Sequence, residues 1–470
     1  MTYMAGANKH KMEDPSVFLN CNKTTADGFL PLSPVGESAQ RAHAFFVAHP
    51  DRGVPYVPVA LMINLFHGMG LGWWNIQHQN TSAYSGSRSD WITIPGQPFG
   101  PYGMSPTQPF TDGDNFTSLL FNTIWPESLP MNIGNNAHDE SKRLVPSKYP
   151  DMFDVLVDVP VDNLGQPGYS YNLFGCSTCG GYRVIVLTGD IDFSASNAAE
   201  PSLQGETGVA DALYSWVDRG GVLVLTAPVL LAPGNHLGEA PWHGLNMSFG
   251  PLATVAVIAV EAGDGMTVKA VDHREVEVFS PPSRPPATGS TNATKVLLSL
   301  ATADKQRVPA VTATTIGSGK VVVIHQPKAA DLDVLGVLDW TLDTVTDGVT
   351  PFTFTGGEIQ TLLNRRESGW NITLVNNLGV TKLCGINAAA GQQHRPNHCG
   401  PDIVDPSKAR KITVALKPDH ARLLGNLSST GAVEHVTGAA LEVVGNTVTV
   451  GQPVPSGAVR VIGVEHVRAP

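Results

Sequence analysis

Two cysteines spaced for redox chemistry stand near the middle of the chain, in Cys176-Ser-Thr-Cys179. A thioredoxin-like site places C-x-x-C after a strand, at the start of a helix, where the thiolate is stabilised. Here the pair precedes the apolar run that begins at Tyr182, and Gly180-Gly181 separates the two. We therefore expect a local disulfide or two inert thiols at this position, and no redox centre.

A second group of metal-binding residue types lies near the C-terminus. Cys384 and Cys399 flank a loop that holds His394 and His398, so a Cys2His2 zinc set is formally possible. The spacing matches no zinc module, and adjacent residues such as His398 and Cys399 do not easily aim at one metal. In an oxidising compartment we predict a disulfide between Cys384 and Cys399 instead. No metal site and no cofactor is predicted.

Two short motifs next to apolar runs have both a chemical and a structural reading. Gly317-Ser-Gly-Lys320 resembles part of a phosphate-binding loop but lacks the first glycine and the following Ser or Thr, so it predicts a hairpin turn. Gly189-Asp190-Ile-Asp192 ends a predicted strand, where open α/β sheets bind ligands. Its two carboxylates suit a cation, although strand-end aspartates more often cap the following element.

Aromatic and histidine side chains cluster in a Gly- and Pro-rich stretch between residues 64 and 92. His67, Trp73 and Trp74 are followed by His78 and Trp91. Sugar rings bind against aromatic faces, so His67, Trp73 and Trp74 are candidate sugar-binding residues. Packing at a domain interface is the alternative, and it is the more common use of such residues.

Composition indicates a globular chain that is rich in sheets and loops. Charged residues make up 15% of the 470 residues, and Gly (48) and Pro (36) together exceed a sixth. The formal net charge of −11 argues against a nucleic-acid partner, which requires a basic surface. No apolar run is long enough to span a membrane.

Seven Asn-x-Ser/Thr sequons favour a secretory history without establishing it. They are Asn22, Asn80, Asn115, Asn246, Asn292, Asn371 and Asn426. The first residues lack the basic flank and apolar core of a signal peptide. We expect a secretory or extracellular location if the chain lacks its true N-terminus, and leave the location open otherwise.

Residues 182–227 contain a complete βαβ pattern. The apolar run from Tyr182 predicts a buried strand, 203–217 carries apolar residues at helical spacing, and Arg219-Gly-Gly221 ends that helix before a second strand at 222–227. A crossover of this kind predicts parallel strands.

Other segments complete two sheet-forming regions. Further strands are predicted at 57–63, 153–158, 254–260, 276–279, 296–301, 308–316 and 321–325, and helices at 33–47, 115–125 and 331–342. After about residue 350 the chain changes to short alternating strands, at 370–380, 411–416, 440–450 and 459–464. Such a series predicts an antiparallel β-sandwich.

In this order the segments resemble the C-terminal portion of a glycoside hydrolase of the family 42 β-galactosidase type. The matching stretches are Leu32–Glu37, His49–Leu61, Tyr182–Leu187, Arg219–Thr226, Ile316–Val323 and Trp370–Lys382. The resemblance implies the end of a (β/α)8 barrel over 1–48, a flavodoxin- or glutamine-amidotransferase-like parallel-sheet domain over 49–348, and a β-sandwich over 349–470.

The resemblance also implies what this chain lacks. The family's two catalytic glutamates follow the fourth and seventh barrel strands, and residues 1–48 correspond only to the eighth strand and its helix. Glycoside hydrolysis needs both carboxylates. We therefore expect a chain without catalytic residues, in which Glu13 lines a sugar site at most. The expected function is that of a non-catalytic part of a glycoside-hydrolase-like protein, or alternatively of a stand-alone carbohydrate-binding or oligomerisation module.

Overall fold

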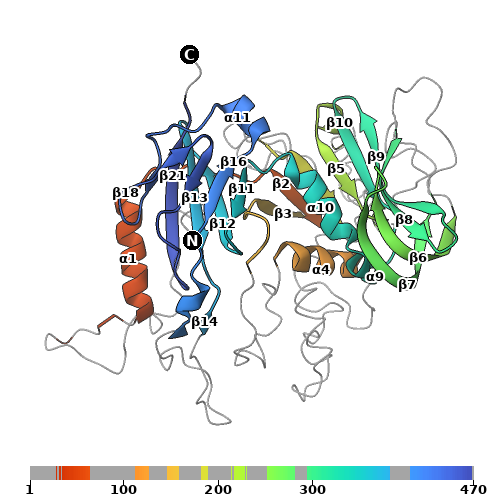
Figure 1. The fold of residues 1–470 in the computed structure, drawn as a ribbon, viewed down its shortest axis with the longest axis horizontal. Coiled ribbons are helices and arrows are strands. Elements are labelled where there is room, and N and C mark those ends of the chain that lie inside the picture. The colour runs from red at the N-terminus through yellow and green to blue at the C-terminus, as the bar shows by residue number, and fades with distance from the viewer. Residues whose placement is uncertain are drawn as a thin grey trace, which may run out of the picture. The chain divides into compact units, whose positions relative to one another are not determined.

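A computed structural model describes twelve segments of the chain. They are residues 28, 31–32, 34–63, 112–125, 146–157, 181–188, 213, 216–227, 229, 251–280, 294–381 and 403–467. The chain divides into two compact units (Figure 1). Unit 1 comprises Met1–Tyr56, Ile124–Met152 and Thr350–Pro470, and unit 2 comprises Val57–Thr123 and Phe153–Val349.

Unit 2 contains the predicted parallel strands. They are β2 (Val59–Ile63), β3 (Phe153–Val157), β4 (Val184–Leu187) and β5 (Val222–Leu225). Strands β4 and β5 pair in parallel, which confirms the parallel pairing predicted from the sequence. All residues of β2 and β4 are buried, as expected for apolar strands covered on both faces.

The same sheet continues into antiparallel strands. These are β6 (Leu252–Ala262), β7 (Thr267–Phe279), β8 (Thr294–Thr302), β9 (Arg307–Ile316) and β10 (Gly319–Ile324). The order of the nine strands is β3-β2-β4-β5-β10-β9-β8-β6-β7. Strand β10 joins the two halves, because it pairs in parallel with β5 and antiparallel with β9. Gly317 and Ser318 form the turn between β9 and β10, and Gly319 and Lys320 begin β10, so the motif is part of a hairpin, as predicted.

Helices of unit 2 differ from the prediction at one point. Helix α4 (Asp112–Ile124) lies where the sequence predicted it. The single helix predicted over 331–342 is wrong: the structure has two, α9 (Ala329–Leu335) and α10 (Val337–Asp347). Gly336 separates them with φ +68°, a left-handed conformation that ends α9 while its N–H donates to the carbonyls of Asp333 and Leu332.

Unit 1 is built on antiparallel sheets, as predicted. The six-stranded sheet has the order β1 (Val54–Pro55), β12 (Gln360–Arg365), β13 (Gly369–Val375), β21 (Val459–Glu465), β17 (Val433–Glu434) and β18 (Ala439–Ala440). The four-stranded sheet has the order β11 (Phe352–Thr355), β16 (Thr413–Leu416), β20 (Thr447–Thr449) and β19 (Val443–Val444). Smaller elements are the pair β14 (Val380–Thr381) and β15 (Ile403–Val404), the 3-10 helix Pro406–Lys408 and α11 (Pro418–Leu424).

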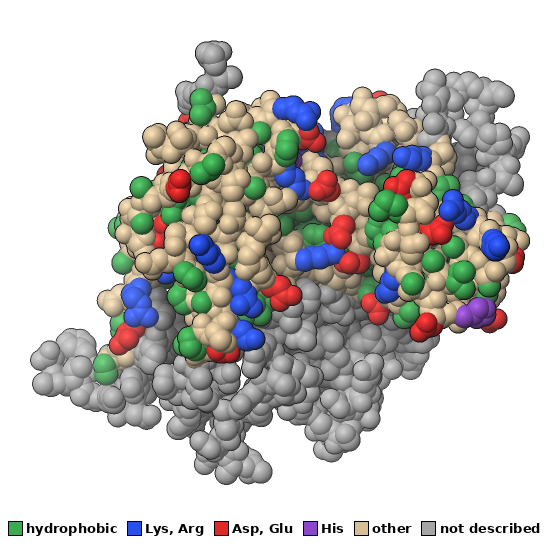
Figure 2. Space-filling view, viewed as in Figure 1, with side chains coloured by type: hydrophobic (Ala, Val, Ile, Leu, Met, Phe, Trp, Pro, Cys, Tyr) green, Lys and Arg blue, Asp and Glu red, His purple; other side chains and the backbone are tan. Residues whose placement is uncertain are grey.

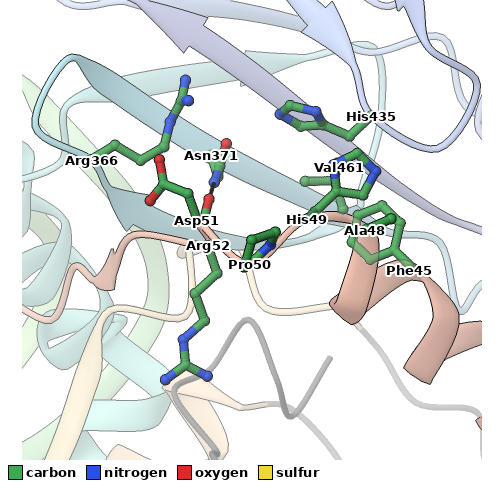
Figure 3. Close-up of a pocket in the computed structure, with 10 residues that line it drawn as sticks. All are labelled: Phe45, Ala48, His49, Pro50, Asp51, Arg52, Arg366, Asn371, His435 and Val461. Atoms are coloured by element: carbon green, nitrogen blue, oxygen red, sulfur yellow. Dashed lines mark hydrogen bonds between the residues drawn. The ribbon is translucent and has the colours of Figure 1, made fainter.

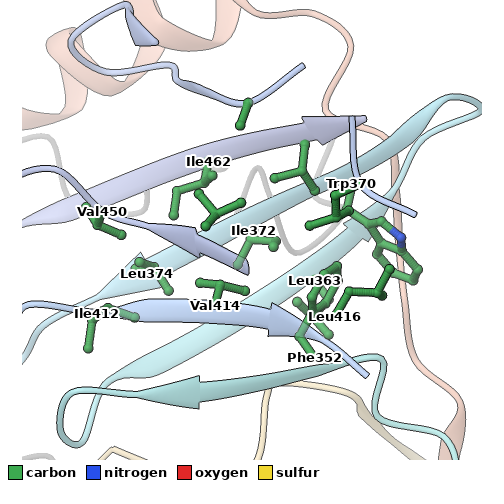
Figure 4. Packing of buried hydrophobic residues seen from close by; sticks show 14 of the residues in the cluster. Phe352, Leu363, Trp370, Ile372, Leu374, Ile412, Val414, Leu416, Val450 and Ile462 are labelled. Carbon is green, nitrogen blue, oxygen red and sulfur yellow. The ribbon is translucent and has the colours of Figure 1, made fainter. Parts of the chain in front are cut away.

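The core of unit 1 lies between its two larger sheets (Figure 4). Alternate residues of β13, Trp370, Ile372 and Leu374, point into it and meet side chains such as Phe352 of β11. The Trp370 ring packs edge-on against Phe352, with centroids 5.5 Å apart, and its indole N–H donates to Nε2 of His466 at 2.9 Å. Trp370 is thus buried with its polar atom satisfied.

Helix α1 (Pro34–Ala48) belongs to unit 1, where it runs beside the six-stranded sheet (Figure 1). The chain leaves α1 and forms β1, which pairs with β12. Gly53 permits this return: its φ is +73°, and a Cβ there would lie 2.5 Å from the carbonyl oxygen of Arg365. The described part of 1–48 is thus packed with the sandwich, and its relation to a barrel stays a prediction.

The surface carries both signs of charge. Lysine and arginine side chains lie among aspartate and glutamate on the face drawn in Figure 2. Among the described residues, no helix combines the length and apolar character needed to cross a membrane.

We predict that Gly319→Ala destabilises unit 2. A Cβ at Gly319 would lie 2.1 Å from the carbonyl oxygen of Val217 and 2.3 Å from that of Gly221. Both are backbone atoms, so the clash is relieved only if the backbone moves. Overpacking of this kind costs about 1–3 kcal/mol. Gly348→Ala is the matched control, because no atom lies within 4 Å of its added Cβ. Chemical denaturation measures both, and equal stability of the two variants would contradict this packing.

Candidate functional site

A pocket of about 210 Å³ lies in unit 1, between the six-stranded sheet and the segment that follows α1 (Figure 3). Its lining includes Phe45 and His49 from the end of α1 and the segment after it. Arg366 comes from the β12–β13 turn, Asn371 from β13, and His435 follows β17. Residues far apart in the sequence therefore meet at one site.

The alternation of β13 places Asn371 on the face opposite the core. Its neighbours Trp370 and Ile372 point into the core, so Asn371 points toward the segment after α1, and it is only 3% exposed. The Asn371 amide donates to the backbone carbonyl of Asp51 at 3.0 Å (Figure 3). This bond fixes the chain where it turns from α1 into β1.

Two histidine rings form one wall of the pocket. The ring centroids of His49 and His435 are 5.0 Å apart, and His49 also packs on Phe45 at 4.5 Å. Gly463 of β21 makes room for this wall, because a Cβ there would lie 2.4 Å from Nε2 of His435. A larger residue at Gly463 would push the His435 ring out of its place.

The surroundings of His435 disfavour its charged form. Burial lowers the pKa of His435 below its usual value, and electrostatic repulsion by His49 and Arg366 lowers it further. The Glu434 carboxylate acts in the opposite direction. The pocket therefore keeps His435 in its neutral form more than water does. A negative charge bound nearby would favour protonation of His435.

Two polar atoms of the pocket residues are buried without a hydrogen-bond partner among the described residues. They are Nε of Arg366, a donor, and Oδ1 of Asn371, an acceptor. The Arg366 guanidinium is otherwise held by a bond from Nη2 to the carbonyl of Val464 at 3.3 Å. Buried polar groups are almost always paired, so an unpaired donor and acceptor at one pocket indicate a place for a small polar molecule.

A second polar cluster lies in unit 2, at the carboxyl ends of the parallel strands. Thr188 follows β4, Thr226 follows β5, and His325 and Gln326 follow β10, all buried. Nε2 of His325 is 2.9 Å from Oγ1 of Thr312. Burial lowers the pKa of His325 to about 4, and a hydrogen bond with the Phe279 backbone opposes this only in part. The imidazole is thus neutral at physiological pH.

This edge is where the sequence predicted Asp190 and Asp192, which lie outside the described residues. The side-chain oxygen and nitrogen of Gln326 and the Thr188 hydroxyl have no hydrogen-bond partner within the described segments. Ligands of open α/β sheets bind at this edge. In the part of the chain that is described, however, no three histidine, cysteine or acidic side chains group as a metal site would require.

Most residues proposed from the sequence fall outside the described segments. These are Glu13, His67, Trp73, Trp74, Cys176, Cys179, Cys384, Cys399 and the sequon residues Asn22, Asn80, Asn246 and Asn292. Their predicted roles stay predictions.

Three sequon residues are described. Asn115 lies in α4, and Asn426 is exposed, with its Oδ1 accepting from Asn446 at 2.9 Å. Asn371 is buried and its amide nitrogen is already bonded to Asp51, so this position is poorly suited to carry a glycan in the folded chain. The structure instead makes it a pocket residue.

The sequence did not indicate Phe45, His49, Arg366 or His435 as site residues. Their spacing along the chain matches no motif, because a helix end, a hairpin turn and a strand end bring them together. The polar residue Asn371 within the alternating stretch Trp370-Asn-Ile-Thr-Leu was the one available signal. In the sequence, this residue indicates a sequon and one position of an alternating strand, and neither pattern indicates a pocket.

Comparison with known proteins places the chain near several glycosidase structures at low similarity. The β-galactosidase from Bacillus circulans sp. alkalophilus shares 8% identity at a TM-score of 0.42, covering 92% of this chain and 45% of its own. The β-galactosidase from Rahnella sp. R3 shares 11% at 0.42, covering 93% and 45%. A catalytic mutant of a GH42 β-galactosidase from G. stearothermophilus shares 11% at 0.41, covering 94% and 45%.

The chain thus spans less than half the length of these three enzymes. No protein-family description and no curated protein matches it. Similarity of this extent assigns neither a family nor an activity to the chain.

We predict that His325 makes unit 2 less stable as the pH falls. Its pKa is 6.5 in the unfolded chain and about 4 in the folded one, so only the unfolded chain binds a proton between these values. The neutral His325 contributes about 3 kcal/mol to the free energy of unfolding. This contribution is fully present above pH 6.5 and is lost as the pH falls to about 4.

Denaturation of the wild type and of His325→Gln at several pH values measures this loss. The stability difference between the two should change by about that amount between pH 7 and pH 4. His273→Gln, at an exposed position of β7, is the matched control and should follow the wild type. Parallel curves for the wild type and His325→Gln would refute the assignment.

Proposed function

We propose that this chain is the non-catalytic, carbohydrate-binding part of a glycoside-hydrolase-like protein. One observation carries the proposal: the pocket in unit 1 combines aromatic walls with a buried donor on Arg366 and a buried acceptor on Asn371 that lack partners within the described residues. The resemblance of the sequence to β-galactosidase-type enzymes supports the choice of ligand class.

The chemistry of the pocket suits a single sugar ring. Sugar hydroxyls both donate and accept, so they can satisfy Arg366 and Asn371 together. The C–H faces of a sugar can pack on the Phe45 ring, which lies beside His49. At about 210 Å³ the pocket is smaller than the sites of drug-sized ligands, which start at about 300 Å³, and its volume suits one ring.

The described residues that line the pocket do not include the groups for hydrolysis. Asp51 is the one carboxylate among its lining residues, and its side chain is exposed. Glycoside hydrolysis uses two carboxylates that flank the bond. The proposed activity of the parent protein, hydrolysis of O-glycosidic bonds of the β-galactosidase type, would therefore require residues other than these.

Calorimetric titration of the purified chain with galactose tests the proposal, together with an assay on 4-nitrophenyl β-galactoside. We expect binding without turnover. Phe45→Ala should weaken binding by about 1 kcal/mol, or about fivefold in Kd, because an aromatic face is lost. Phe46→Ala removes the neighbouring ring, which does not line the pocket, and should bind as the wild type does.

Two results would count against the proposal. Turnover by the purified chain would contradict a non-catalytic role. Equal loss of binding in Phe45→Ala and Phe46→Ala would show that the sugar does not bind in the pocket.

The second candidate function is assembly through unit 2, and exposed apolar side chains on the β6–β7 hairpin favour it. Met266 is 68% exposed, Val268 43% and Ile258 41%, and β7 is the outermost strand of the described sheet. Large apolar side chains at a sheet edge are typical of protein contacts. A second copy of this chain is the proposed partner.

For this candidate we expect light scattering to report more than one chain per particle. The double variant Met266→Lys/Val268→Lys should shift the mass to that of one chain, because burying two ammonium groups is unfavourable. Val436→Lys, at a 48% exposed position of unit 1, is the control and should leave the mass unchanged. A wild type that is already a single chain at all concentrations would exclude assembly through this hairpin.

A further inference from the structure

We propose that the pocket of unit 1 selects a sugar that carries a carboxylate, a uronic acid, over a neutral sugar. The inference rests on the proposed function and specifies the ligand class of the same site. It is carried by the arrangement of Arg366, Asn371 and the two histidines around one cavity.

Arg366 supplies the charge that a carboxylate needs. Its Nε is buried, and no other described residue accepts a hydrogen bond from it. The described structure also contains no ion pair of Arg366 with a carboxylate, although Asp51 lines the same pocket. Guanidinium groups bind carboxylates through charge-assisted, often bidentate bonds, so an anion would satisfy Nε where a neutral hydroxyl would do so more weakly.

Asn371 adds the requirement for a hydroxyl group. Its Nδ2 is already bonded to the Asp51 carbonyl, and its buried Oδ1 accepts from none of the described groups. An acceptor of this kind needs an O–H donor, which a carboxylate does not offer at neutral pH. A ligand that satisfies both Arg366 and Asn371 therefore carries a carboxylate and a hydroxyl together, as a uronic acid does.

The charges around His435 point in the same direction. His49, from the segment after α1, and Arg366, from the β12–β13 turn, oppose protonation of His435, and Glu434 of β17 favours it. Asp51 and Arg52 complete the charged lining, and the Asp51 side chain is exposed to solvent. A bound anion would raise the pKa of His435, so binding should take up a proton and strengthen as the pH falls.

Calorimetry with sodium galacturonate, galactose and sodium acetate at pH 6 and pH 8 tests the inference. We expect galacturonate to bind at least about tenfold more tightly than galactose at pH 6, as a charge-assisted hydrogen bond provides. Its affinity should fall between pH 6 and pH 8, by at most about tenfold per pH unit for one linked proton. Acetate, which lacks a hydroxyl donor, should bind more weakly than galacturonate.

Two variants separate binding from folding. Arg366→Gln should abolish the preference for galacturonate over galactose, whereas Arg410→Gln should keep it. Arg410 is the matched control because its guanidinium also donates to a backbone carbonyl in unit 1, outside the pocket. His435→Gln should lose the gain in galacturonate affinity between pH 8 and pH 6, an effect that a merely structural residue would not produce.

Each contrary result has a distinct meaning. Equal binding of galactose and galacturonate overturns this inference and leaves the proposed function standing. Acetate binding as tight as that of galacturonate also overturns it, because the hydroxyl would then play no part. If none of the sugars binds, both the inference and the proposed function fail.

Discussion

Strand β13 is buried on both faces, and much of unit 1 follows from that constraint. All seven of its residues are buried. One face packs into the sandwich core through Trp370, Ile372 and Leu374, while the other carries Asn371 and Thr373. Burying an amide or hydroxyl is favourable only when it is hydrogen-bonded, so the covering segment must present polar backbone to this face.

The segment after α1 meets that requirement only in part. The Asp51 carbonyl takes one hydrogen bond of Asn371, and Gly53 lets the chain approach β12 closely enough to pair as β1. The side-chain oxygen Oδ1 of Asn371 and the hydroxyl of Thr373 have no hydrogen-bond partner among the described residues. The covered face of β13 therefore keeps polar atoms without hydrogen-bond partners beside a cavity, and a polar ligand suits such a cavity. The proposed ligand site is thus a consequence of how this sheet is covered.

Local patterns predicted much of the fold and little of the site. The buried strands 184–187 and 222–225 are short apolar runs bounded by glycine, so both their existence and their parallel pairing could be inferred. Sequence periodicity reports which residues are buried but not which strands become neighbours. The merging of β6–β9 with the parallel strands depends on β10 pairing with both halves, a long-range contact without a local signal. The break at Gly336 was similarly hidden, because one glycine is tolerated within many helices.

Asn371 shows why the site itself was missed. In the sequence it belongs to an Asn-x-Thr motif, and the motif points to a glycan on the surface. In the structure, the period of two that places Trp370 and Ile372 in the core necessarily turns Asn371 to the other side of β13. Whether that side faces solvent or protein depends on α1 and the segment after it, more than 300 residues earlier in the chain, as the separation of 320 between Asn371 and Asp51 illustrates. A strand pattern assigns a residue to a face, and only the tertiary structure determines whether that face is a surface, a core or a binding site.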